Sequence, residues 1–417
     1  MRFLICFSFL FLGCLQPEKE IVDYIIPLAI DDANDIKSFE HIGSIVADRD
    51  IVILGESDHG DGKTIELKSR LVKYLIEEKG FNTFAGEGVG FFDMEILNEN
   101  PSKITIPQNF LKNIWALSWG YSEPLISTLE KNQVKYIGIE SDSYLLSQSP
   151  EMRMKYLKKN LNVSDRTKFA GILKEMEETF LKISSLSAAK VSENEIGLYI
   201  QNLEMIKANI NGQNNTDENK SELLTKVIEN MVSFAEYFKY FNIIGTYKAQ
   251  NIAINLRDEQ MAKNLIWYKE RHKDAKIIVW TANFHGAKKI REIRYKEEEP
   301  DLYNDFILFG EHLHNEYGSD VYSIAFTSAT GETSTPFGER TKTIKIDAER
   351  GTLENKLYEK RLEYGFLDFS AIRKSYPGLI DKVFSAKILG HDNKPGKWLQ
   401  VFDGVFFLRT ESPLSHQ

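Results

Sequence analysis

Cysteine is almost absent from this sequence. The chain of 417 residues contains two cysteines, Cys6 and Cys14, and both lie close to the N-terminus. The rest of the chain has no thiol with which to form a disulfide, ligate zinc or act as a cysteine nucleophile. Long apolar runs are also missing, because no stretch beyond residue 12 approaches the ~20 apolar residues of a membrane-spanning helix. Cysteine catalysis is therefore excluded, and only the N-terminus could attach the chain to a membrane.

An excess of positive charge is missing as well. Lys and Arg number 52 against 61 Asp and Glu, which gives a formal net charge of -9. Nucleic-acid binding depends on Lys and Arg that neutralise phosphates, so we expect no nucleic acid as a partner. The composition, 42% hydrophobic, 12% aromatic and 27% charged, is that of a globular protein with a sizeable core. The length suits one large domain that carries an insertion.

The N-terminus has the pattern of an export signal. Arg2 precedes an apolar run over residues 3–12, which is too short to span a bilayer. The run ends in Phe-Leu-Gly-Cys, which resembles the bacterial lipobox, although Phe11 stands where Leu is usual. We expect residues 1–13 to be a lipoprotein-type signal peptide, Cys14 to be acylated and residues 14–20 to form a tether. The body would then be exported to the cell envelope, in the periplasm or on the outer surface, and held to a membrane by the lipid on Cys14. A plain secretory signal and an uncleaved anchor are the alternatives.

Strand and helix patterns alternate in two parts of the chain, over residues 21–149 and 251–417. Short apolar, β-branched runs predict strands, and residues 63–79 show helical spacing before Gly80, a typical helix end. The strand candidates are residues 50–55, 83–85, 134–139, 276–280, 320–326 and 404–408. This alternation predicts an α/β fold with a largely parallel central sheet covered by helices on both faces.

The sequence pattern changes over residues 150–250. Apolar residues recur there at helical spacing along three long amphipathic segments, and no strand pattern interrupts them. We therefore expect an inserted helical bundle between the two parts of the α/β domain.

The loop over residues 55–64 lies between a predicted strand and a predicted helix, at the edge of the sheet where α/β proteins bind ligands. Gly62-Lys63-Thr64 matches the end of a phosphate loop, but Ser57 stands where that motif begins with Gly. A nucleophile elbow centred on Ser57 would need Gly at position 59, which is His59. The third interpretation is an acid/base pair of Glu56 and His59. From the residues alone, an acid/base role for this pair and simple capping of the next helix explain the sequence equally well.

Four segments together resemble the erythromycin esterase-like family. Residues 54–60, Leu-Gly-Glu-Ser-Asp-His-Gly, are similar to its opening signature, and Glu87 follows on a later strand. Residues 255–258, Asn-Leu-Arg-Asp, resemble its Arg-Asp helix, and residues 279–285 resemble its Trp-x-x-Asn-x-His strand end. Residues 309–313 fit too. The resemblance spans roughly residues 51–326 in the family's order. Asp58 departs from it, since a small hydroxyl or apolar residue is usual there.

This resemblance implies roles for five residues. His59 would be the general base that activates water, with Glu56 and Glu87 as the carboxylates that orient it. His285 and Arg257 would steady the substrate or the oxyanion. From the residues alone, a surface ion pair for Arg257 and a core histidine at 285 are also open.

The predicted function is accordingly hydrolysis of a small-molecule ester or lactone, without a cofactor. A divalent metal bound by His59, His285, Glu56 and Glu87 is the alternative within the enzyme hypothesis. A surface binding lipoprotein that has lost catalysis is the alternative outside it. Inactivation of a macrolide antibiotic is compatible with the resemblance, but a fold and its motifs do not determine the substrate.

Overall fold

The computed structural model describes residues 20–30, 37–92, 94–95, 122–141, 149–184, 191–211, 218–294, 301–334 and 342–414. The predicted signal peptide and Cys14 lie outside these ranges. None of the described helices combines the length and the apolar character that would let it cross a membrane.

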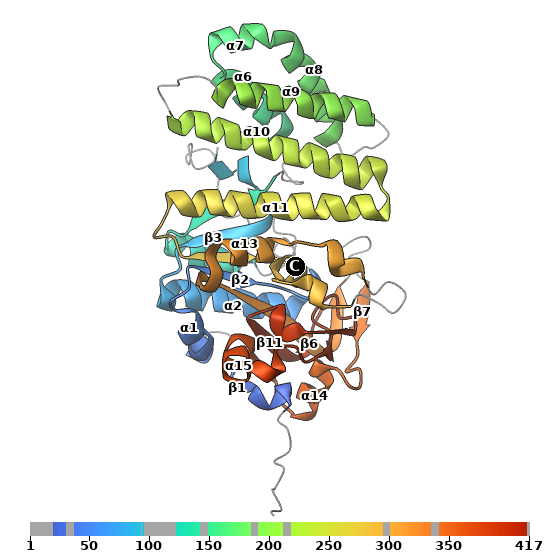
Figure 1. Cartoon of the computed structure of the whole chain (residues 1–417). Coiled ribbons are helices and arrows are strands. Elements are labelled where there is room, and N and C mark those ends of the chain that lie inside the picture. Colours follow the sequence, from blue (N-terminus) through green and yellow to red (C-terminus); the bar gives the residue numbers. More distant parts are fainter. Residues whose placement is uncertain are drawn as a thin grey trace, which may run out of the picture.

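Strands and helices follow one another along the chain (Figure 1). The strands are β1 (Ile26–Leu28), β2 (Ile51–Leu54), β3 (Thr83–Gly90), β4 (Lys135–Glu140), β5 (Ile277–Trp280), β6 (Val321–Ser334), β7 (Thr343–Ile346), β8 (Tyr364–Asp368), β9 (Phe384–Ala386), β10 (Lys394–Gly396) and β11 (Gly404–Glu411). The α-helices are α1 (Glu40–Val46), α2 (Gly62–Lys79), α5 (Ser122–Lys131), α6 (Ser149–Asn160), α7 (Val163–Lys168), α8 (Ala170–Ser184), α9 (Glu193–Asn211), α10 (Glu218–Phe238), α11 (Tyr247–Arg271), α12 (Asn283–Gly286), α13 (Phe309–Tyr317), α14 (Leu353–Glu359) and α15 (Phe369–Ser375).

Among the described residues, nine strands form one sheet in the order β1-β8-β11-β6-β2-β5-β3-β4, with β7 paired to β6. The central pairs, from β11 through β6, β2, β5 and β3 to β4, are all parallel. Antiparallel pairing occurs where β8 joins β1 and β11, and where β7 joins β6. The prediction of a largely parallel α/β sheet is confirmed.

Both faces of this sheet are buried beneath helices. Side chains of successive strand residues point to opposite faces, and β2 shows the consequence. Val52 and Leu54 pack with residues of α1, α2 and α5, whereas Ile51 and Ile53 pack with residues of α11 and α13. A strand that is apolar on both faces therefore forms a continuous apolar run, as the sequence pattern of residues 51–54 indicated.

The helices α6 to α10 lie between β4 and β5 in the chain and share a hydrophobic core of their own. Figure 1 shows them stacked beyond α11, at the end of the molecule opposite β1 and α14. The long helix α11 connects this helical unit to the sheet. Asn264 on α11 exchanges side-chain hydrogen bonds of 2.7 and 3.0 Å with Asn230 on α10, and its amide also donates to the carbonyl of Ile139 on β4.

Candidate functional site

The predicted acid/base loop leaves the carboxyl end of β2 in the middle of the sheet. Gly55 lies against Asn283, so close that a Cβ at position 55 would come within 2.1 Å of the Asn283 amide oxygen. The backbone N–H of Asn283 donates to the carbonyl of Glu56 at 2.8 Å. The loop is therefore held against the start of α12, the segment that also carries His285.

Glu56 and His59 form a direct pair within this loop. His59 Nδ1 lies 2.9 Å from Glu56 Oε1, and the side chains are 23% and 1% exposed, respectively. A carboxylate can only accept, so Nδ1 carries the proton and Nε2 is left as the basic nitrogen. Burial by itself would lower the pKa of His59. The hydrogen bond to Glu56 and the negative charges of Glu87 and Glu56 outweigh this and raise it.

A buried lysine that the sequence analysis did not single out completes this pair. Lys68 on α2 is fully buried, and its ammonium forms an ion pair with Glu56 Oε2. The same ammonium lies 3.9 Å from the ring centroid of Trp280 and 3.4 Å from the carbonyl oxygen of Thr281. Burial lowers the pKa of Lys68, although the charge of Glu56 opposes this. Each oxygen of Glu56 thus has its own cationic or donating partner.

Glu87 lies on β3, which is separated from β2 by β5 in the sheet. Its Oε2 accepts hydrogen bonds from the Thr281 hydroxyl at 2.7 Å and the Ala282 N–H at 3.0 Å, and its Oε1 accepts one from Arg257 at 3.1 Å. Burial alone would raise the pKa of Glu87. The charges of His285 and Arg257 dominate, however, and hold the pKa well below its ordinary value. Glu87 is therefore an ionised carboxylate with several donors.

His285 is held between two carboxylates. Its Nδ1 lies 2.8 and 2.9 Å from the two oxygens of Asp258, and its Nε2 lies 3.3 Å from Glu87 Oε1. Burial favours the neutral ring, but the charges of Asp258 and Glu87 raise the pKa of His285 to about 10 in spite of the nearby Arg257. The two carboxylates thus favour the protonated ring of His285.

Arg257 on α11 bridges the carboxylates of two adjacent strands. Besides Glu87, its guanidinium contacts both oxygens of Glu140 at the end of β4, with 3.1 Å from Nε to Oε2. Its Nη1 lies 2.9 Å from His285 Nε2. Burial raises the pKa of Glu140, and Arg257 opposes that rise. The surface ion pair that the sequence left open for Arg257 is therefore not its environment.

The five predicted residues fall into two groups at the carboxyl ends of β2, β3 and β5. Glu56 and His59 form one group, and Glu87, Arg257 and His285 form the other. They are linked electrostatically, since the charge of Glu87 raises the pKa of His59 and that of His59 lowers the pKa of Glu87.

The competing interpretations of the loop find less support in the geometry. The hydroxyl of Ser57 donates to the carbonyl of Ile388 at 2.9 Å, and so does not face a histidine base. Lys63 pairs with Glu66 at 2.9 Å, and the Thr64 hydroxyl with Glu411 at 2.6 Å. Both side chains of the apparent phosphate loop thus bind carboxylates.

A metal ion fits these residues poorly. Within the described ranges, no three His, Cys, Asp or Glu side chains are arranged to hold one. The four residues of the metal hypothesis are divided between the two groups, and the oxygens of Glu56 and Glu87 already accept hydrogen bonds or ion pairs.

Sequence reasoning missed Lys68 and Glu140, and each had a weak signal. Lys68 stands on the apolar stripe of a helix, next to Leu67 and one turn from Leu71 and Val72. Glu140 directly follows an apolar strand run, at the same sheet edge as Glu87. A charged residue in either place suggests a buried ion pair.

Comparison with known proteins places the chain in a family. The model of the erythromycin esterase family matches residues 76–410. The chain is 22% identical to the erythromycin esterase type II of Escherichia coli, over 95% of this chain and 98% of the relative. It is also 22% identical to the putative hydrolase YbfO of Bacillus subtilis, over 82% and 79% of the two chains.

Solved structures agree on the fold. A mutant of the erythromycin esterase EreC in its open conformation superimposes with a TM-score of 0.71 and 17% identity, over 90% of this chain and 94% of that one. A protein described as a succinoglycan biosynthesis protein gives a TM-score of 0.70 with 20% identity, over 95% and 96%. With the family model covering most of its length, the chain belongs to the erythromycin esterase family.

Proposed function

We propose that this protein hydrolyses a carboxylic ester or a lactone, and that His59 activates the attacking water. Family membership supports a hydrolase. The observation that carries the finer proposal is the arrangement around His59. Its imidazole is partly exposed, its Nδ1 is occupied by Glu56, and its Nε2 remains as the base.

In this proposal His59 Nε2 takes a proton from water as the oxygen attacks the substrate carbonyl carbon. The imidazolium that forms is stabilised by the adjacent carboxylate of Glu56. Lys68 holds the second oxygen of that carboxylate and so keeps Glu56 in position. The carbon–oxygen bond to the leaving group then breaks, and the proton returns from His59 to the departing alkoxide.

The second group supplies positive charge for the oxyanion. Arg257 is a guanidinium, and its Nη1 lies 2.9 Å from Nε2 of His285, a ring whose pKa is raised by neighbouring carboxylates. Their neighbours Glu87, Asp258 and Glu140 orient these two side chains by direct hydrogen bonds. Charge that is already oriented costs no reorganisation during the reaction, which is why such groups accelerate acyl transfer.

The substrate is proposed only as a class, a small-molecule ester or lactone, because the scaffold does not define it. No resident cofactor takes part in these steps. We also propose that the protein acts outside the cytoplasm, anchored to a membrane through a lipid on Cys14. The support for this is the apolar run and the lipobox-like sequence at the N-terminus.

The test is hydrolysis of short-chain nitrophenyl esters and of a panel of lactones by the purified protein. His59→Ala should lose activity by a factor of about 10² to 10⁴, the range for a general base. Ser57→Ala is the matched control from the same loop and should retain most of it. Equal loss in both variants would contradict water activation by His59. Absence of turnover of every ester and lactone would favour a binding protein.

A further inference from the structure

The end of the molecule nearest the N-terminus has surface features of its own. The first described residue, Glu20, precedes the short helix η1 (Ile21–Tyr24), which packs beside α14 and β8. Figure 1 shows this region at the end of the molecule opposite the helical unit. We call it the N-terminal pole, and define it by η1, α14 and the segment from Lys374 to Ser385.

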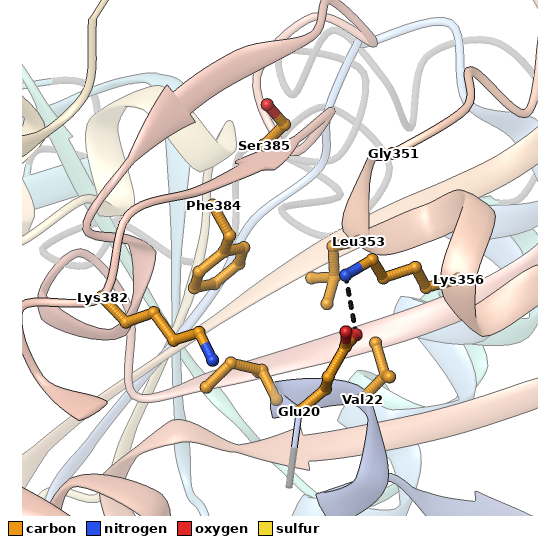
Figure 2. A pocket seen from close by; sticks show the side chains of 9 residues that line it. Glu20, Val22, Gly351, Leu353, Lys356, Lys382, Phe384 and Ser385 are labelled. Carbon is orange, nitrogen blue, oxygen red and sulfur yellow. Dashed lines mark hydrogen bonds and ion pairs between the residues drawn. The ribbon is translucent and has the colours of Figure 1, made fainter. Parts of the chain in front are cut away.

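A small pocket of about 70 Å³ opens on this pole (Figure 2). Its apolar wall is formed by Val22, Leu353 and Phe384. Figure 2 shows the ammonium groups of Lys356 and Lys382 approaching it from opposite sides. Lys356 pairs with Glu20 at 2.7 Å. Lys382 has no carboxylate partner among the described residues.

Exposed apolar side chains lie next to this pocket. Val383, directly before Phe384, is 59% exposed, and Tyr376 is 42% exposed. The ring of Tyr376 lies 4.7 Å from that of Tyr24 in η1, so it belongs to the same surface. Tyrosine beside lysine is a combination enriched where proteins meet the headgroup region of a bilayer.

The pole carries charged side chains of both signs, and most of them form ion pairs. Its carboxylates Glu20 and Asp23 pair with Lys356 and Lys360, and Asp381 pairs with Lys397. These pairs neutralise one another. Lys374 and Lys382 remain without a carboxylate partner in the part of the chain that the structure describes, and Glu359 at the end of α14 is the exposed carboxylate that stands against them. Two positive charges against one negative charge favour an anionic partner, although the whole protein has a net charge of -9.

The chain itself limits how far this pole can lie from a membrane. Six peptide units connect Cys14 to Glu20. Even fully extended, they span at most about 22 Å, since a chain advances no more than ~3.6 Å per residue. If Cys14 carries the lipid, Glu20 must therefore lie within that distance of the lipid surface. The tether sets no such limit on parts of the molecule farther from Glu20.

We propose that the N-terminal pole docks on an anionic bilayer surface, with Lys374 and Lys382 at the level of the lipid phosphates and Tyr376 and Val383 in the headgroup region. This inference rests on the proposed anchor at Cys14 and is independent of esterase activity. The docked orientation directs the helical unit of α6 to α10 away from the membrane, into the aqueous phase.

The near absence of cysteine makes the test clean, because Cys6 lies in the predicted signal peptide and an acylated Cys14 has no free thiol. The full chain, produced in a bacterium that processes lipoproteins, is reconstituted into vesicles of phosphatidylcholine and phosphatidylglycerol. An environment-sensitive fluorophore is attached in Val383→Cys or, as a control, in Leu198→Cys. Leu198 is 51% exposed on α9, in the helical unit.

Spin-labelled lipid in the vesicles should quench the fluorophore at position 383 at least several-fold more than at position 198. Combining Val383→Cys with Lys374→Glu and Lys382→Glu should weaken that quenching. The matched pair Lys155→Glu and Lys174→Glu, exposed lysines of α6 and α8, should not. Equal quenching at both positions, or none at position 383, would overturn the proposal. So would unmodified Cys14 in the mass spectrum together with an unquenched label at position 383.

Discussion

Lys68 and Glu56 form an ion pair that is closed off from solvent beneath His59. The ammonium has a single carboxylate partner and otherwise lies against the Trp280 ring and a backbone carbonyl. Such a pair is costly to break from one side, because the remaining charge stays buried without compensation. Lys68 therefore supports both the stability of the protein and the position of the carboxylate that orients the proposed base.

Replacing Lys68 with Met tests this directly. We expect Lys68→Met to lower the free energy of unfolding by about 3–5 kcal/mol, the cost of leaving one buried partner uncompensated. The control is Lys63→Met, which removes an ion pair to Glu66 that is about one quarter exposed on each side. That change should cost less than about 1 kcal/mol. Denaturant unfolding measures both, and equal effects would show that the buried pair has no special role.

The pH dependence of hydrolysis should follow His59. Its pKa is raised above 6.5, mainly through Glu56 and Glu87 acting against burial, and the protonated ring cannot accept a proton from water. Activity should therefore increase as pH rises through the His59 pKa. Glu56→Gln removes a negative charge, so it should move this limb to lower pH while reducing the maximal rate. A profile of kcat/KM against pH checks this. If Glu56→Gln left the pH at which activity rises unchanged, Glu56 would not control the pKa of the base.

The sequence predicted the position of a residue best where that position depends on a short motif and on one strand. The loop after β2 was predicted from the apolar run at residues 51–54 and from the glycine that follows, and it carries Glu56 and His59 at the expected sheet edge. Helix α2 and its left-handed end at Gly80 were also predicted. These features depend on neighbours in the chain.

Contacts between segments that are distant in the sequence were harder to predict. The predicted strand at residues 134–139 stopped one residue short of Glu140, and so missed the carboxylate that binds Arg257. The strand predicted at residues 83–85 and running to Glu87 was too short as well, because β3 continues to Gly90. Where a strand ends depends on its pairing with neighbouring strands, such as that of β3 with β4 and β5. The periodicity within one segment does not contain that information.

Stability should depend on pH through His285. Its pKa in the folded protein is about 10 and thus above the ordinary 6.5, which means that the folded state binds the proton more tightly. The resulting stabilisation is complete below about pH 6.5 and is lost as pH rises toward 10. His285→Gln should flatten the decline in unfolding free energy over this range. The exposed His272 supplies a control, His272→Gln, which should leave the decline unchanged.

Glu411 should also make stability fall as pH rises, but here because its own negative charge is unfavourable in the folded protein. It is buried close to Asp61, and both effects raise its pKa to about 8. The folded state therefore loses stability between pH 4.5 and 8, as the unfolded chain releases its proton first. Glu411→Gln should increase the unfolding free energy at pH 9 relative to the parent protein, by an upper limit of about 5 kcal/mol, and change it little at pH 4. A loss of stability at pH 9 would mean that the hydrogen bonds to Lys63 and Thr64 matter more than the charge.

The central claim, that His59 is the base that activates water, is tested most directly by chemical rescue. Hydrolysis of a nitrophenyl ester by His59→Gly is measured with and without added imidazole. The account predicts a loss of about 10² to 10⁴ in kcat/KM, with partial recovery that increases with imidazole concentration. A His59→Gly variant that hydrolyses the ester at the parental rate without imidazole would contradict it.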